Sequence, residues 1–178
     1  MNHWAGNVKK KTGFTLTEFM VTLAIAAIFL ALAVPGYYST IQNNRVVSAV
    51  NEISAFMHFA RTEAIRRGVR VSVCAAANTS LTSCGSATQW RQGWLVFVDT
   101  NNNNAIDSTA DIIRVHEALP ANMAVTANNS LVSYDGSGFI TSGAFNMTVN
   151  ATGCTGNNVR IINILASGRL GITRGACS

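Results

Sequence analysis

The stretch Lys9-Lys10-Lys11-Thr12-Gly13-Phe14-Thr15-Leu16-Thr17-Glu18 leads into a segment that is apolar from residue 19 to residue 34 except for Thr22. As a helix, residues 14–34 would extend about 31 Å, close to the thickness of the hydrocarbon core of a bilayer. A carboxylate at the centre of such a helix costs about 3 kcal/mol to insert, but Glu18 lies near its start. If the chain is cut after Gly13, Glu18 falls in the first turn and a half, where free N–H groups and the helix dipole favour an anion.

The position of this junction argues against an ordinary secretory signal peptide. Signal peptides carry their small residues after the apolar region, whereas Gly13 precedes it, so the apolar helix is expected to be retained. Lys9, Lys10 and Lys11 predict that the leader lies in the cytoplasm and that the chain after residue 34 lies across the inner membrane.

The motif Lys-Thr-Gly, followed by Phe-Thr-Leu-Thr-Glu and an apolar helix, resembles the type III leader of type IV prepilins and pseudopilins. The resemblance implies that residues 1–13 are a leader, which a prepilin peptidase removes after Gly13 before the new terminal residue Phe14 is N-methylated. It also implies that Glu18, the fifth residue of the mature chain, docks against the N-terminal amine of a neighbouring subunit.

Composition supports an anchor followed by one globular domain. The 178 residues are 48% hydrophobic and 12% charged, whereas soluble proteins average about 25% charged residues, and the apolar segment largely explains the difference. All three lysines lie in the leader. Without them the formal charge of +5 falls to +2, from ten arginines and eight acidic residues, so the basicity is mostly a targeting signal.

A second helical segment, residues 36–68, follows the membrane segment, residues 14–35. Pro35 removes one N–H and crowds a carbonyl of the preceding turn, which predicts a kink or a loosened helix; the alternative is that Pro35-Gly36 ends it. Beyond this point apolar residues alternate in steps of four and three, which predicts one buried helix face: Val46, Val50, Ile53, Met57, Ala60 and Ala64. Gly68 is the expected C-terminal cap.

The rest of the chain, residues 69–178, has the pattern of short strands separated by turns. The expected strands are 69–73, 93–98, 111–118, 123–127, 131–134, 144–149, 159–165 and 170–173, with a loop at 74–89. Their spacing favours antiparallel sheets. We therefore expect an α+β fold in which a long N-terminal helix packs on antiparallel β-sheet.

Three further motifs are similar to those of the GspH/FimT group of pilin-like proteins: Ala-Arg-Thr-Glu-Ala-Ile-Arg-Arg-Gly at 60–68, Gly-Trp-Leu-Val-Phe-Val-Asp-Thr-Asn-Asn-Asn at 93–103, and Gly168-Arg169. This group contains the minor pseudopilin of type II secretion and minor pilins of the FimT/FimU type. The resemblance implies the type IV pilin fold.

The four cysteines, Cys74, Cys84, Cys154 and Cys177, all lie in the exported part. Their spacing matches neither a zinc site nor a C-x-x-C redox motif, so disulfides are expected in an oxidising compartment. Three pairings are open. The two local ones, Cys74–Cys84 and Cys154–Cys177, are favoured.

No sequence pattern predicts catalysis or a bound metal or cofactor. His58 and His116 lie in no metal or nucleophile motif, and the usual hydrolase and phosphate-binding motifs do not occur. Residues 99–107 partly resemble a calcium loop, but the glycine and the bidentate acid that such a loop needs are replaced by Asn104 and Ala110. An Asx-rich turn is the favoured interpretation, with a calcium site as the alternative.

Arg160, Arg169 and Arg174 form a candidate DNA-binding set, because arginine binds phosphates bidentately. Some FimT-type minor pilins are thought to bind DNA in natural transformation through a late Gly-Arg-x-Arg element. Gly168-Arg169 matches its start, but Gly171 stands in place of the second arginine. Arg174 can replace it only if its side chain lies on the same side as that of Arg169. No aromatic residue on which a DNA base could stack is close in sequence.

The predicted function is that of a minor pilin. Such a subunit is held in the inner membrane by a single helix, with its domain in the periplasm, and then assembles with other pilins, at the pilus tip or elsewhere in the filament. DNA is an additional candidate partner. The alternative is a minor pseudopilin of type II secretion that binds no nucleic acid.

Overall fold

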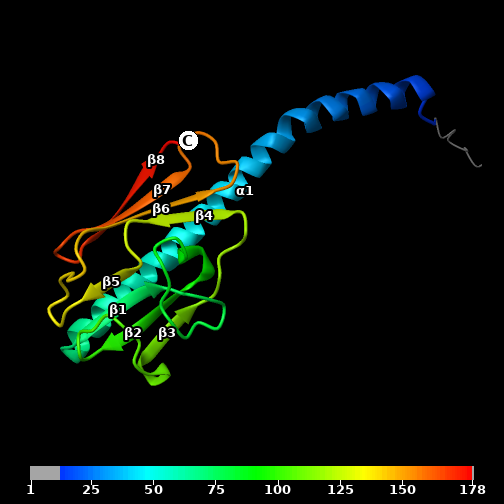
Figure 1. Ribbon diagram of the computed structural model, residues 1–178. Coiled ribbons are helices and arrows are strands. Elements are labelled where there is room, and N and C mark those ends of the chain that lie inside the picture. The colour runs from blue at the N-terminus through cyan, green and yellow to red at the C-terminus, as the bar shows by residue number, and fades with distance from the viewer. Residues whose placement is uncertain (1–12, 178) are drawn as a thin grey trace, which may run out of the picture. The chain divides into compact units, whose positions relative to one another are not determined.

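The computed structural model describes residues 13–177, so most of the predicted leader lies outside the described residues. Its first element is the helix α1 (Leu16–Arg67), of 52 residues (Figure 1). Because α1 continues through Pro35 and Gly36, the interpretation that this pair ends the helix is wrong. The chain divides into two compact units after Tyr38, and α1 contributes to both.

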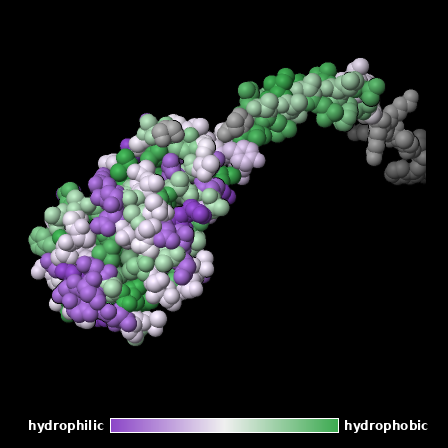
Figure 2. Space-filling model, viewed as in Figure 1, coloured by the Kyte–Doolittle hydropathy of each residue, from purple (hydrophilic) through white to green (hydrophobic). Residues whose placement is uncertain are grey.

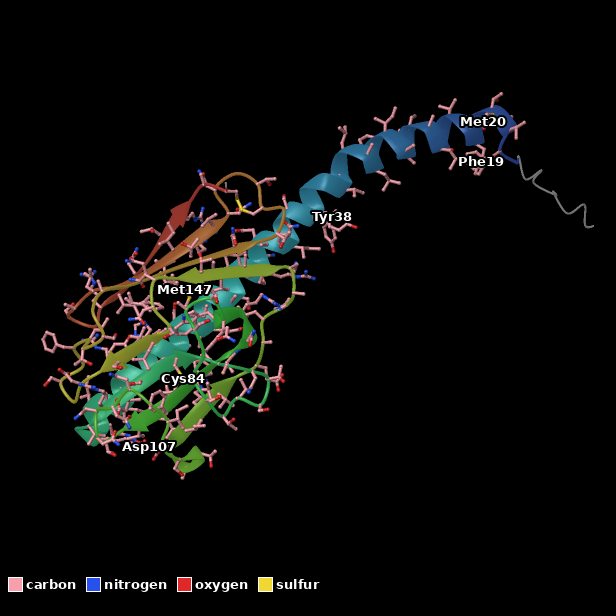
Figure 3. The ribbon with its side chains drawn as sticks, in the orientation of Figure 1. Phe19, Met20, Tyr38, Cys84, Asp107 and Met147 are labelled. Atoms are coloured by element: carbon pink, nitrogen blue, oxygen red, sulfur yellow. A yellow bond between two sulfur atoms is a disulfide. The ribbon has the colours of Figure 1, made fainter. Side chains whose placement is uncertain are left out.

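The first unit consists of the apolar start of α1. Its large side chains are exposed, among them Phe19, Met20 and Leu32, the last at 75% exposure. In Figure 2 this segment is almost entirely hydrophobic at its surface, and Figure 3 shows Phe19 and Met20 projecting outward from the helix. It is long and apolar enough to cross a bilayer, and no part of its most apolar stretch is buried.

In the second unit, α1 buries the predicted face. Val46, Val50, Ile53, Met57, Ala60 and Ala64 are each at most 2% exposed, which confirms the expected stripe. Ala49 and Phe56 are also buried, so the apolar face is wider than the sequence pattern predicts. The helix ends at Arg67, and Gly68 follows in the left-handed conformation with φ of 67°, as a C-terminal cap requires.

Eight strands follow α1, and two short 3-10 helices, η1 (Trp90–Gln92) and η2 (Thr109–Asp111), lie in the loops before β2 and β3. The strands are β1 (Arg70–Ala75), β2 (Trp94–Asp99), β3 (Ile112–His116), β4 (Met123–Ala127), β5 (Leu131–Tyr134), β6 (Phe145–Ala151), β7 (Val159–Ile164) and β8 (Leu170–Gly175). The bounds of β4 and β5 are those predicted. The predicted start of the loop at Cys74 is wrong, because Cys74 pairs with both Leu95 and Leu131 and therefore belongs to β1.

The strands form two antiparallel sheets, as expected. The first has the order β3-β2-β1-β5 and the second the order β4-β6-β7-β8. Buried residues of α1 and of both sheets make one continuous core, which includes Met147 of β6 (labelled in Figure 3). The fold is thus α+β, with a long helix packed on antiparallel sheets.

The outer face of the first sheet carries a smaller core of its own. Cys74, Ala76, Leu95 and Phe97 are fully buried there, because Leu81, Cys84 and Ile106 cover them from the two long loops. The structure pairs Cys74 with Cys84 and Cys154 with Cys177, with Cα atoms 5.6 and 5.8 Å apart. These are the two local pairings that the sequence favours.

Arg61 of α1 donates hydrogen bonds to two loops, the one after β5 of the first sheet and the one between β7 and β8 of the second. Its Nε donates to the carbonyl of Gly138 at 3.0 Å, and its Nη2 donates to the carbonyl of Ser167 at 3.1 Å. Gly168 lies against the same Gly138 carbonyl. The first and last motifs shared with the GspH/FimT group, at residues 60–68 and 168–169, therefore meet in space.

Candidate functional site

Glu18 lies in the first turn of α1 and faces its own helix start. Its Oε2 accepts from Thr15 N–H at 3.4 Å and from the Thr15 hydroxyl at 3.5 Å, while Glu18 N–H donates to Thr15 Oγ1 at 3.3 Å. This is a capping box, with Thr15 as N-cap and Glu18 three residues later. None of the ion pairs among residues 13–177 includes Glu18, so its charge is available to a partner.

Thr22, the polar residue inside the apolar segment, satisfies its hydroxyl locally. It donates to the carbonyl of Phe19 at 2.8 Å, within the same helix turn. Because that bond needs no water, Thr22 is compatible with a hydrocarbon environment.

The side chain of Arg160 has a structural role. It is 5% exposed, and its guanidinium donates to the carbonyls of Asn157 and Val159 and, at 2.9 Å, to Asn43 Oδ1 of α1. Burial, and then the charge of Arg174, lower the pKa of Arg160. An arginine held in this way has few donors left for an external phosphate.

The structure brings Arg174 next to Arg160 but separates it from Arg169. Arg174 pairs directly across β7–β8 with Arg160 and is exposed. Arg169 precedes β8, where its carbonyl accepts from Leu165 N–H. Arg174 lies five positions further on, near the end of β8, which is about 17 Å along an extended chain. Arg174 therefore does not replace the arginine missing at Gly171.

The loop after β2 is closed by its own hydrogen bonds. Asp99 is 1% exposed and accepts from the N–H groups of Asn103 and Asn104 at 3.0 and 3.1 Å. Asp107 accepts from the side-chain amides of Asn101 and Asn103 at 2.8 and 2.9 Å. The carboxylates and amides thus bind the loop itself, as in an Asx-rich turn.

His116 joins β3 to α1, which the sequence pattern did not indicate. Its ring stacks on Trp94 with centroids 3.9 Å apart and lies 3.1 Å from a carboxylate oxygen of Glu52. Nearby, the guanidinium of Arg114 lies over the rings of Phe56 and Phe59. The His116–Glu52 contact links residues 64 positions apart, beyond the reach of any local pattern.

Two family models match the chain. The model for type II transport protein GspH matches residues 49–168, most of the globular domain. The model for the prokaryotic N-terminal methylation motif matches residues 8–34, which contain Gly13, Phe14 and Glu18.

Known relatives and solved structures agree with these matches. Two fimbrial proteins of Pseudomonas aeruginosa are each 42% identical over 48 residues, which are 27% of this chain and 31% of the relative. Two crystal structures of the P. aeruginosa type IV minor pilin FimU superimpose with TM-scores of 0.58 and 0.55 at 16% and 17% identity. They cover 76% and 74% of this chain and 96% and 98% of FimU, and at this identity they show a shared fold.

Proposed function

This chain belongs to the GspH family of type IV pilin-like proteins, and we propose on that basis that it is a minor pilin of a type IV pilus system. The observation that carries the proposal is the N-terminal unit. It combines the methylation motif with a helix whose large apolar side chains are exposed, and such a surface requires a membrane or neighbouring helices around it. The proposed role is structural and requires no catalytic residue, metal or cofactor.

In this proposal the subunit is first processed in the membrane and then assembled into the filament. A prepilin peptidase removes the leader after Gly13 and the amine of Phe14 is methylated, while residues 14–34 hold the chain in the inner membrane with its domain in the periplasm. On assembly the same helix leaves the lipid and packs among the helices of other pilins, where Glu18 meets the terminal amine of a neighbour. The subunit then primes or caps the filament.

A deletion strain and an epitope-tagged chain test this proposal against its alternative. We expect deletion to reduce surface piliation while type II secretion continues, and the tagged chain to occur in sheared pili. The alternative is a minor pseudopilin, for which deletion would stop secretion and leave pili unchanged. That second outcome would contradict the proposal.

A second candidate function is DNA binding, which the exposed, acid-free position of Arg174 beside Arg160 favours. Within residues 13–177, no carboxylate pairs with Arg169 or Arg174. Because Arg169 lies before β8 and Arg174 near the end of that strand, a DNA contact limited to one end of the strand should depend on only one of them.

A mobility-shift assay on the full chain in detergent tests the DNA hypothesis. We expect binding to weaken steeply between about 50 and 200 mM salt, because phosphate contacts release counterions. One of Arg169→Ala and Arg174→Ala should weaken binding and lower the salt slope by about one, whereas the exposed Arg91→Ala should not. No binding at low salt would exclude the hypothesis, and equal binding by all variants would exclude these arginines.

A further inference from the structure

A polar cavity of about 620 Å³ opens on the first sheet, and its described lining includes none of the late arginines. Its lining comes from segments that are distant in sequence: Arg70 of β1, Asn104 of the loop after β2, Asn129 and Ser130 between β4 and β5, and Ser142 between β5 and β6. Cys84, labelled in Figure 3, adds the disulfide loop to the wall. The cavity is thus built only by the tertiary fold.

The lining has hydrogen-bond donors to spare. Arg70 uses Nη1 for Asn102 O and Asn104 Oδ1, while its Nη2 donates to none of the described residues. The side-chain amide of Asn129 and the hydroxyl of Ser130 likewise donate to no group within residues 13–177. Ser142 Oγ accepts from Ser133 N–H but donates to no described group.

The side-chain amide and backbone acceptors of Asn104, Asn129 and Ser130 in the lining are occupied. Asn104 Oδ1 accepts from both Arg70 and Ser133, and Asn129 Oδ1 accepts from Leu131 N–H. The backbone carbonyls of Asn129 and Ser130 accept from Trp90 Nε1 and Ala75 N–H. Among the described residues, no aspartate or glutamate lines the cavity. A ligand that supplies acceptors therefore fits this lining better than one that supplies only donors.

Among the described residues of the lining, the only charged group is the guanidinium of Arg70, and the buried carboxylate of Asp99 partly balances its charge. Asp99 Oδ2 lies 3.7 Å from Arg70 Nη1 without lining the cavity, and both Asp99 oxygens accept from backbone N–H groups. A single guanidinium that already has a carboxylate beside it balances the charge of a monoanion better than that of a phosphate dianion. A neutral polyol would find the amide and backbone acceptors of Asn104, Asn129 and Ser130 occupied, and it carries no charge to pair with Arg70.

We propose that this cavity binds a carboxylate group, which accepts from Arg70 Nη2 and from the amide and hydroxyl donors of Asn129, Ser130 and Ser142. The carboxylate belongs either to a small organic acid or to an acidic side chain of a partner protein. Both sources present the same monoanion with two acceptor oxygens to the same donors.

Nuclear magnetic resonance on the full chain in detergent micelles tests this site. Sodium acetate and N-acetyl-glutamate amide are titrated at constant ionic strength against chloride. We expect saturable shifts of the Asn129 side-chain amide and of the Ser130 and Ser142 backbone amides. Equal affinity for both probes indicates a small acid as the ligand, and tighter binding of the glutamate derivative indicates a side chain.

Asn129→Asp is the most direct variant, because it preserves shape and the acceptor for Leu131 N–H while replacing a donor with a negative charge. We expect it to raise the dissociation constant about tenfold or more. Asn51→Asp makes the same change on an exposed face of α1 and should leave the constant unchanged. If Asn129→Asp does not fold, Ser130→Asp replaces it, since that side chain makes no hydrogen bond with the described residues.

Three results would overturn the proposal. The first is a set of shifts that neither aspartate variant weakens. The second is tighter binding of inorganic phosphate than of acetate. The third is binding of methyl glucoside, a neutral polyol, at the same residues.

Discussion

Glu18→Val should enter the membrane normally but should be incorporated into filaments at least about a hundredfold less than the parent chain. Insertion is expected to persist because the change makes an apolar helix more apolar. Assembly is expected to fail because a buried ion pair that loses one partner costs about 3 to 5 kcal/mol. In the proposed filament the unpaired group would be the terminal amine of the neighbouring subunit.

Glu18→Gln separates this role from helix capping. Glutamine retains the capping-box geometry with Thr15 but has no charge. If the charge directs docking, both variants should be absent from sheared pili while both remain in the inner-membrane fraction. Incorporation of Glu18→Gln at the parental level would show that Glu18 acts only as a cap, and parental incorporation of Glu18→Val would contradict any role in assembly.

Gly168→Ala should lower the free energy of unfolding by roughly 3 kcal/mol. The residue has φ of 73°, a conformation that costs an L-residue about 1 to 2 kcal/mol. A Cβ at this position would also meet the carbonyl oxygen of Gly138 and the Nε of Arg61. The hairpin β7–β8 would then have to move away from the loop after β5, which breaks the bonds that Arg61 makes to both.

Gly143→Ala provides the matched control for this prediction. Its φ of 83° imposes the same conformational cost, but a Cβ there would meet nothing within 4 Å. Denaturant unfolding of the detergent-solubilised chain, followed by the fluorescence of the buried Trp90 and Trp94, should show the larger loss for Gly168→Ala. Equal losses would mean that close packing at Gly168 contributes nothing.

Local periodicity explains how much of this fold was predictable. The apolar stripe from Val46 to Ala64 and the eight strands depend on side-chain spacing along a short segment, which neighbouring residues alone specify. The strand ends were less predictable, because pairing with other strands determines them. Cys74 joins β1 because it has partners on both sides, in β2 and β5.

The candidate sites likewise divide into those that local spacing predicts and those that depend on contacts between distant segments. The sequence by itself predicted the junction at Gly13 and the docking role of Glu18, and it determined the membrane-length helix with its methylation motif, since these depend on order along one helix. Only the tertiary structure decided that Arg160 is held by the fold, that Arg174 pairs with Arg160 across β7–β8, and that Arg61, Gly138 and Gly168 meet. The reason is physical: strand register and loop closure set distances between residues far apart in the chain, and local spacing carries no information about them.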